Sequence, residues 1–354
     1  METIEYFGVL SLVPASVAIV LAFVTRNTVF SLATACLVGV LVAGKGFMGF
    51  PNLLKSALGN TNFSWVLLLE LFIGISIAFF QRTGAIHNFS QFVARRKMTR
   101  IRVQLISWFM GMFVYFSDYF SPLFVGSTMR ALSDRFKISR EKLAYICDST
   151  SAPVSILVPI TGWAVLVASL LIGMGSIHTP ADAMMVFIMA IPFNIYAILA
   201  VLMVGLIAMN IIPDFGPMKR AEIRAVEQGK VLDDNAEPLM GEELTDIQPY
   251  QGIKTSLLWN FFFPVLIVVS FAIGSFIITA SAKPMEAFLL SSVIAGIIMR
   301  VQGIPLAEIM RTAMSGIKGI MPAIIILALA YSLNDLSKSL NTAQYIISST
   351  QSWL

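Results

Sequence analysis

The sequence predicts an all-α polytopic membrane protein, and two observations carry that prediction. Of its 354 residues, 57% are hydrophobic and only 12% are charged, whereas a soluble domain carries about 25% charged residues. Several apolar stretches also reach the roughly 20 residues that a helix needs to cross the hydrocarbon of a bilayer. The alternating pattern of a membrane β-barrel is missing from the sequence. We therefore expect a multi-pass helical protein of the cytoplasmic membrane.

The apolar segments set the expected organisation. They lie at about 8–25, 28–44, 63–81, 103–129, 143–173, 183–209, 256–280, 284–300 and 317–336. A charged stretch from Pro213 to about Lys254 separates the last three from the others. We therefore expect a first transmembrane repeat over 1–210, a cytoplasmic linker loop over 211–255 and a partial second repeat over 256–354.

Basic residues predict that the segment 103–129 is a re-entrant hairpin. Arginine and lysine clusters precede it at 95–102 and follow it at 130–142, and both clusters favour the cytoplasmic side. A simple span between them would place one cluster outside. The segment is also interrupted near its middle by Ser117, Asp118 and Pro122. Re-entrant backbone is tolerated in a membrane where protein or a water-filled cavity covers it.

The same orientation rule predicts that the two halves are inverted. With the hairpin in place, the first half starts outside and the second half starts inside, at about Thr255. Two halves of opposite orientation are typical of inverted-repeat secondary transporters. The expected fold is therefore an inverted-repeat transporter with a re-entrant hairpin and a broken helix, its second repeat incomplete.

Two acids within apolar segments are candidate ion ligands. Asp118 lies at the expected hairpin tip, and Asp148 precedes a run that Pro153 and Pro159 interrupt. A carboxylate at membrane depth is costly and is therefore a functional candidate. A broken helix frees carbonyl oxygens that can coordinate a cation. The further candidate ligands are Ser117, Tyr119, Ser149 and Thr150.

Simpler interpretations of these acids stay open. Asp148 can end a helix at the cytoplasmic boundary, and Asp118 can be an ordinary turn residue. Glu70, about a third of the way into its span, is a secondary candidate that can instead reach the outer interface. The two cysteines, Cys36 and Cys147, lie in apolar segments and are expected to be unpaired.

One region resembles a known family. The resemblance rests on Asp118–Phe120, Val125–Arg130, Asp134–Ile146, Asp148–Pro153 and Pro159. These residues are similar to those of the NhaC family of Na⁺/H⁺ antiporters, within the ion-transporter superfamily. The resemblance implies two inverted repeats around a central cation site, lined in this chain by Asp118, Asp148, Ser149 and Thr150. Asp118 and Asp148 would then be the Na⁺ ligands.

This chain departs from the family pattern in two places. The family usually carries a pair of acids where this chain has Ser117 and Asp118. The sequence also stops at Leu354, before a second hairpin and a second broken helix. We therefore expect the chain to lack a C-terminal part, and a partner polypeptide or a homodimer to complete the site.

The expected function is exchange of Na⁺ for H⁺ by a secondary active transporter. Two alternatives stay open: an ion-coupled exchanger of organic acids such as malate and lactate, and an inactive fragment or non-transporting membrane subunit. Metalloprotease, nucleophile-elbow and P-loop motifs are missing from the sequence, so an enzyme is not expected. No cofactor and no nucleic-acid partner are expected, because Na⁺ and H⁺ are the cargo and the lipid bilayer is the surroundings.

Overall fold

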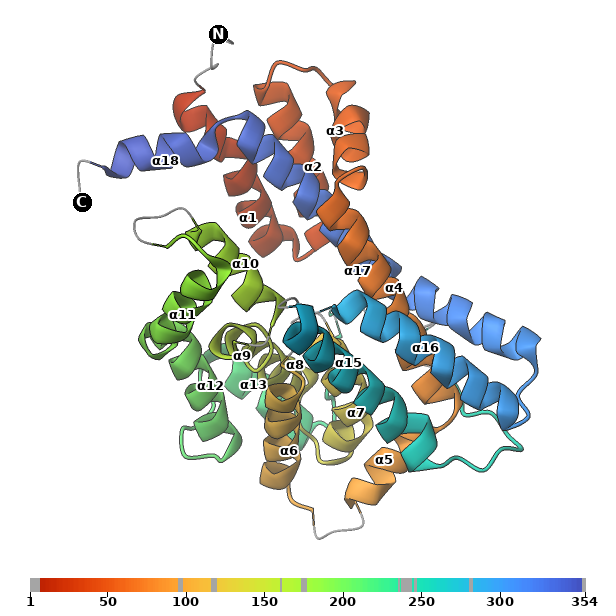
Figure 1. Ribbon diagram of the computed structural model, residues 1–354. Helices are drawn as coiled ribbons and strands as arrows, with labels where there is room; N and C mark the ends of the chain where they lie inside the picture. The colour runs from red at the N-terminus through yellow and green to blue at the C-terminus, as the bar shows by residue number, and fades with distance from the viewer. Residues whose placement is uncertain are drawn as a thin grey trace. The chain divides into compact units, whose positions relative to one another are not determined.

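A computed structural model describes residues 7–94, 98–115, 120–159, 161–172, 177–234, 236, 244, 247–279 and 283–351. Helices account for the regular structure, and no strand occurs among these described residues. The all-α fold that the composition predicted is therefore confirmed. The chain divides into two compact units, drawn together in Figure 1 and described separately below.

The first unit holds the chain's ends. It contains residues 1–68, 237–241 and 319–354. Its helices are η1 (Gly8–Leu12), α1 (Val13–Thr25), α2 (Thr28–Val42), α3 (Gly49–Leu58) and α18 (Thr342–Thr350). Two long helices, α4 (Thr61–Arg82) and α17 (Leu306–Ser339), each contain a boundary between the units.

The second unit holds the remaining helices, over residues 69–236 and 242–318. They are α5 (Ala85–Ala94), α6 (Arg100–Phe113), α7 (Phe120–Arg135), α8 (Arg140–Ser149), α9 (Ala152–Leu157), α10 (Gly162–Leu171), α11 (Pro180–Ala190), η2 (Ile191–Phe193), α12 (Ile195–Ala208), α13 (Gly216–Glu227), η3 (Leu258–Phe262), α15 (Phe263–Thr279) and α16 (Pro284–Val301). Helix α13 lies within the charged stretch that the sequence predicted to be a loop.

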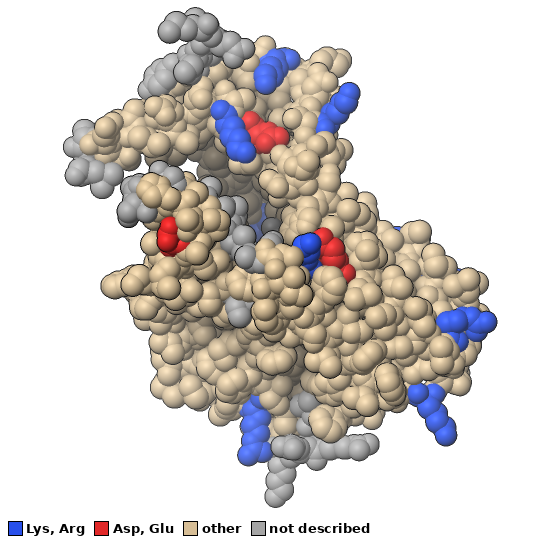
Figure 2. Space-filling view, in the orientation of Figure 1, with Lys and Arg blue, Asp and Glu red and all other residues tan. Residues whose placement is uncertain are grey.

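Helix length and surface chemistry both support a multi-pass membrane protein. Five helices in the described part of the chain are long and apolar enough to cross a membrane. A sixth span forms if α11 and α12, bent by 49° to each other, are taken together. Large apolar side chains such as Phe23 and Ile278 are more than 80% exposed, as lipid-facing residues are. On the face shown in Figure 2, charged side chains are few and most of the surface is uncharged.

In the first unit, α1, α2 and the later part of α17 pack together. Helices α1 and α2 pack directly on each other, and Val40, Leu336 and Leu340 form a buried core. The ring of Phe63 meets Tyr331 edge-on, with centroids 5.5 Å apart. These contacts join the start of α4 to the end of α17 by apolar packing.

In the second unit, aromatic rings fix α7 against its neighbours. Phe124 of α7 stacks on Phe261 at 5.5 Å and meets Phe80 of α4 at 6.2 Å. Phe261 also stacks on Phe89 of α5 at 4.7 Å. Aromatic pairs in these arrangements stabilise packing beyond the area they bury. They hold one arm of the expected hairpin against α4, α5 and η3.

Within the same unit, α4 and α17 run in opposite directions. Arg82, at the end of α4, forms an ion pair of 2.7 Å with Glu308, in the first turn of α17. Gly74, eight residues before Arg82 on α4, is in contact with Gly316, eight residues after Glu308 on α17. The two helices are therefore antiparallel and in register over this length.

Candidate functional site

The segment 103–129 forms two short helices that lie side by side. Helices α6 and α7 contact each other and α8 (Figure 1). The Ser121 hydroxyl lies 3.4 Å from the Gly111 carbonyl oxygen and can donate to it. With 14 and 16 residues, the two helices are about 21 and 24 Å long, too short to cross a membrane. Their basic ends begin at Arg100 and end at Arg135, as a re-entrant hairpin requires.

The helix that follows is interrupted twice. Helix α8 ends at Ser149, and α9 begins at Ala152 with a proline in its first turn. Because Pro153 has no N–H, the Ser149 carbonyl four residues earlier loses its usual donor. Helix α9 ends at Leu157, and Val158 and Thr161 are extended before α10 begins. The described residues are therefore non-helical at 150–151 and again at 158–159 and Thr161.

At the second interruption, a side chain replaces the hydrogen bond that the proline removes. Pro159 cannot donate to the Ser155 carbonyl, and the Thr161 hydroxyl donates to that oxygen instead, at 2.7 Å. The same Thr161 oxygen accepts from the backbone N–H of Ala164, at 3.1 Å, and so caps α10. Thr161 therefore lies between α9 and α10 and hydrogen-bonds to a residue of each.

The hairpin packs directly against the first interruption. A Cβ atom added to Gly111 would collide with the side chain of Thr150, so the two residues are in close contact. The Ser155 hydroxyl lies 2.9 Å from the Tyr115 carbonyl oxygen, at the end of α6. Gly111 and Ser121 lie about 16 and 21 Å from the basic ends of the hairpin. The contact is therefore well inside the helix pair, away from its basic ends.

Asp148 lies in the last turn of α8, beside this contact. Its side chain is exposed on the surface of the single chain. Among the described residues, no Lys, Arg or His side chain lies within ion-pair distance of it. The C-terminal end of a helix carries a partial charge of roughly −0.5. A carboxylate at that end, next to the Ser149 carbonyl that Pro153 leaves without a donor, makes a local negative potential. This end of α8 can attract a cation.

The other predicted site residues differ in where they lie. Ser117, Asp118 and Tyr119 fall outside the described residues, between Tyr115 and Phe120. Thr150 is fully buried, and its hydroxyl donates within α8, to the Ile146 carbonyl at 2.7 Å. Pro122 lies in the first turn of α7 and Pro153 in that of α9. The secondary candidate, Glu70, lies on α4 and is only 2% exposed.

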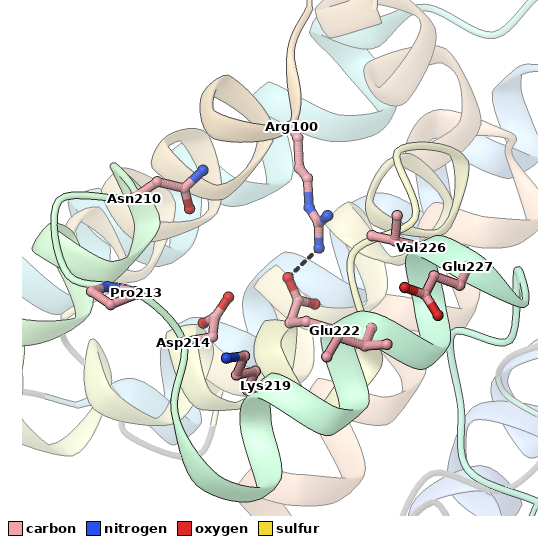
Figure 3. Close-up of a pocket in the computed structure, with 9 residues that line it drawn as sticks. Arg100, Asn210, Pro213, Asp214, Lys219, Glu222, Val226 and Glu227 are labelled. Carbon is pink, nitrogen blue, oxygen red and sulfur yellow. Dashed lines mark hydrogen bonds and ion pairs between the residues drawn. The ribbon is translucent and has the colours of Figure 1, made fainter.

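A charged cluster lies at the basic end of the hairpin, which sequence reasoning missed. Figure 3 shows Arg100 of α6 reaching Glu222 of α13, with which it forms an ion pair. Lys142 of α8, only 1% exposed, forms ion pairs with Asp214 at 2.8 Å and with Glu222 at 3.4 Å. We refer to Arg100, Lys142, Asp214 and Glu222 as the Glu222 cluster.

The Glu222 cluster joins the hairpin to the broken helix. Besides its ion pairs, Glu222 accepts a hydrogen bond of 2.8 Å from the backbone N–H of Ser139, the residue that caps α8. A carboxylate at a helix N-terminus is stabilised by the helix dipole. One side chain from the linker therefore contacts the first residue of α6 and the start of α8. The small residues Ala221 and Ala225, buried on either side of it, were the available signal for a packed helix.

The wider linker follows the same surface. Arg224 pairs with Glu141 at 2.6 Å, and the Arg140 backbone N–H donates to the Val231 carbonyl at 2.8 Å. A cavity of about 350 Å³ lies between α13 and the residues around Asn210 and Asp214 (Figure 3). The described part of the linker around α13 is thus packed onto the start of α8.

Comparison with known proteins identifies the family. Residues 172–353, just over half of the chain, match the Na⁺/H⁺ antiporter family. The chain belongs to the Na⁺/H⁺ antiporter family. This membership, together with the apolar spans, makes the protein a cation/proton exchanger in general terms. The matched region begins after the residues that carry the NhaC resemblance.

One relative of this protein aligns with nearly the whole chain. An uncharacterized protein of Haemophilus influenzae is 28% identical over 387 aligned residues. The alignment covers 98% of this chain and 71% of that protein. No solved structure matches.

Proposed function

We propose that this antiporter-family protein exchanges Na⁺ for H⁺ across the cytoplasmic membrane and is of the NhaC type. The observation that carries the proposal is the contact between the hairpin and the interrupted helix, at Gly111 and Thr150. Asp148 lies two residues before that contact, at the negative end of α8. A carboxylate and a freed carbonyl there supply the oxygen ligands that a hard cation prefers.

Competition for one site explains the exchange. A proton and a cation compete for the same carboxylate oxygens, because a bound cation requires the ionised form. In this proposal Asp148, with Asp118, which the sequence predicts at the hairpin tip, holds either a proton or Na⁺. Each ion displaces the other as the site opens to opposite sides of the membrane. Na⁺ and H⁺ are cargo in this scheme, and no cofactor takes part.

The antiparallel arrangement of α4 and α17 supports the inverted repeat. These helices are the third spans of the two expected repeats, and inverted repeats require corresponding helices to run in opposite directions. The NhaC-like residues from 118 to 159 include both interruptions of the broken helix. A homodimer or a partner polypeptide belongs to the same proposal.

Transport by the purified chain in proteoliposomes tests the proposal. We expect a Na⁺ pulse to dissipate an imposed pH gradient, read with an internal pH-sensitive dye. We expect Asp148→Asn and Asp118→Asn each to abolish this response, because an amide cannot alternate between a proton and Na⁺. Unchanged exchange in Asp148→Asn would contradict the assignment of that carboxylate.

Asp234→Asn is the matched control. Asp234 lies in the linker, where a hydrogen bond from Lys230 and its charge lower the pKa of the carboxyl. It is far in sequence from the hairpin, so its variant should exchange Na⁺ normally. Uptake of labelled malate or lactate, without any Na⁺-dependent proton movement, would replace the proposal with organic-acid exchange. No exchange of either kind would show that the chain by itself is not a transporter.

A further inference from the structure

Two polar side chains buried inside the hairpin have no hydrogen-bond partner among the described residues. Gln104 of α6 is 1% exposed, and neither its Nε2 nor its Oε1 atom is partnered. Thr128 of α7 is fully buried, and its hydroxyl is likewise unpartnered. Buried polar groups in proteins are nearly always hydrogen-bonded, to protein or to ordered water. Three unpartnered atoms in one helix pair therefore point to a ligand.

The hairpin register places these two side chains opposite each other. Ser121 contacts Gly111 across the hairpin. Gln104 lies seven residues before Gly111, and Thr128 lies seven residues after Ser121. Seven residues are nearly two full turns of helix, so both side chains return to the face at which α6 and α7 meet. They lie about 10 Å nearer the basic end than the Gly111–Ser121 contact.

Polar groups also occupy the interval between these two levels. Ser107 lies between Gln104 and Gly111 on the buried face of α6, and its hydroxyl donates to the Val103 carbonyl at 3.0 Å. Beyond Gly111 lies Thr150, at the interruption of α8. A buried polar stripe thus runs from Gln104 to the interrupted helix. The charged groups near the start of α8 already have partners: Arg140 pairs with Asp134, Glu141 with Arg224, and Lys142 with Asp214 and Glu222.

We propose that Gln104 and Thr128 bind water in a narrow hydrated path, through which the transported cation reaches the interrupted helix from the cytoplasmic side. Water is the ligand that fits, because it donates to the Gln104 Oε1 and Thr128 oxygens and accepts from the Gln104 Nε2. A bare cation would be repelled by the partial positive charge of the Gln104 Nε2 amide group. This inference rests on the proposed function for its direction of transport, whereas the hydration of the path is a separate physical claim.

Silver ion accessibility tests the path without any transport assay. Ag⁺ is a monovalent cation that reacts with thiols and is small enough to follow a path open to a cation. In the full chain with Cys36→Ala and Cys147→Ala, Thr128→Cys is compared with Met129→Cys. Met129 is 1% exposed and is the next residue of α7, so it has the same depth and burial on a different face.

Local opening of the helix would expose both cysteines alike. A path that passes residue 128 should instead favour one of them. We therefore expect Ag⁺ added to the cytoplasmic face of everted vesicles to block Thr128→Cys about tenfold faster than Met129→Cys. Blocking is read as the loss of later alkylation in the unfolded chain. Equal rates for the two cysteines, or no reaction at Thr128→Cys, would overturn the path. This result stands even if the protein exchanges a different cation.

A pair of substitutions separates hydration from packing. Thr128→Ser keeps the hydroxyl and removes a methyl group, whereas Thr128→Val keeps the shape and removes the hydroxyl. We expect Thr128→Ser to exchange normally and Thr128→Val to lose exchange about tenfold, a change equal to about 1.4 kcal/mol. Any other pattern contradicts the role of the hydroxyl. Ser133→Ala is the control, because that buried hydroxyl of α7 already donates to the Arg130 carbonyl at 2.9 Å.

Discussion

Gly316 of α17 lies so close to Gly74 of α4 that a Cβ atom on Gly316 would be 2.5 Å from the Gly74 carbonyl oxygen. Backbone meets backbone at this point, and no side chain can be accommodated between the two helices. Small residues at such crossings are common in membrane proteins, where close packing rather than water exclusion drives helix association.

Gly316→Ala should therefore destabilise the protein. The added methyl group must push the helices apart, and overpacking of this kind costs about 1–3 kcal/mol. The measurement is the thermal unfolding of the purified protein in detergent, where we expect a lower melting temperature. Gly274→Ala on α15 is the matched control, because nothing lies within 4 Å of its Cβ position. An equal loss in both variants would exclude the close crossing as the cause.

Gly111→Ala should separate the hairpin from the interrupted helix, because the added methyl group meets the Thr150 side chain. We expect loss of exchange and a lower melting temperature. Thr150→Gly in the same chain removes the colliding atoms and should restore part of the stability. A double-mutant cycle measures this coupling, expected at about 1 kcal/mol or more for residues in contact. Purely additive effects would show that the two residues do not touch.

Gly126→Ala on α7 is the control for this prediction, because its Cβ position is open. It should leave the melting temperature unchanged or slightly raised.

Glu222→Ala should destabilise the start of α8. It leaves Lys142, which is only 1% exposed, with Asp214 as its remaining carboxylate, and it leaves the Ser139 N–H without its acceptor. Breaking a buried ion pair costs about 3–5 kcal/mol, and the remaining Asp214 should keep the loss at the lower end. Chemical denaturation followed by intrinsic fluorescence measures it. Glu227→Ala, on an exposed position of the same helix, should change the stability by less than about 0.5 kcal/mol. A similar loss in both would show that α13 responds to any change of charge.

Ser155→Ala should weaken the contact between α9 and the end of α6. The Ser155 hydroxyl lies 2.9 Å from the Tyr115 carbonyl oxygen and 3.0 Å from that of Ser151, and it donates to one at a time. We expect a loss of about 1 kcal/mol, the usual net contribution of one hydrogen bond, and a higher Na⁺ concentration for half-maximal exchange. Ser275→Ala removes a hydroxyl that donates to the Ala272 carbonyl within α15 and accepts from the Lys283 backbone N–H, and it should leave the Na⁺ dependence unchanged. If both variants shift it equally, the Tyr115 contact does not position the hairpin.

The interruptions of the broken helix could be predicted because their cause is local. Pro153 and Pro159 lack N–H groups in any fold of the chain. Helix α9 begins at Ala152 with Pro153 in its first turn, and α10 begins at Gly162, beyond Pro159. The start of α17 could not be predicted in this way. The sequence predicted a span over 317–336. The helix begins at Leu306, and Glu308 in its first turn pairs with Arg82 from a distant part of the chain.

The sequence by itself determined that this protein lies in a membrane, that its backbone is helical, and that one helix is interrupted. Each of these depends on composition or on the chemistry of single residues. Only the tertiary structure decided that Glu222 of the linker meets Arg100 and the cap of α8, and that Gly111 touches Thr150. It also decided that Gln104 and Thr128 are buried without partners. Such relations depend on which residues of different helices come together, and hydrophobic periodicity within a single helix carries no information about that.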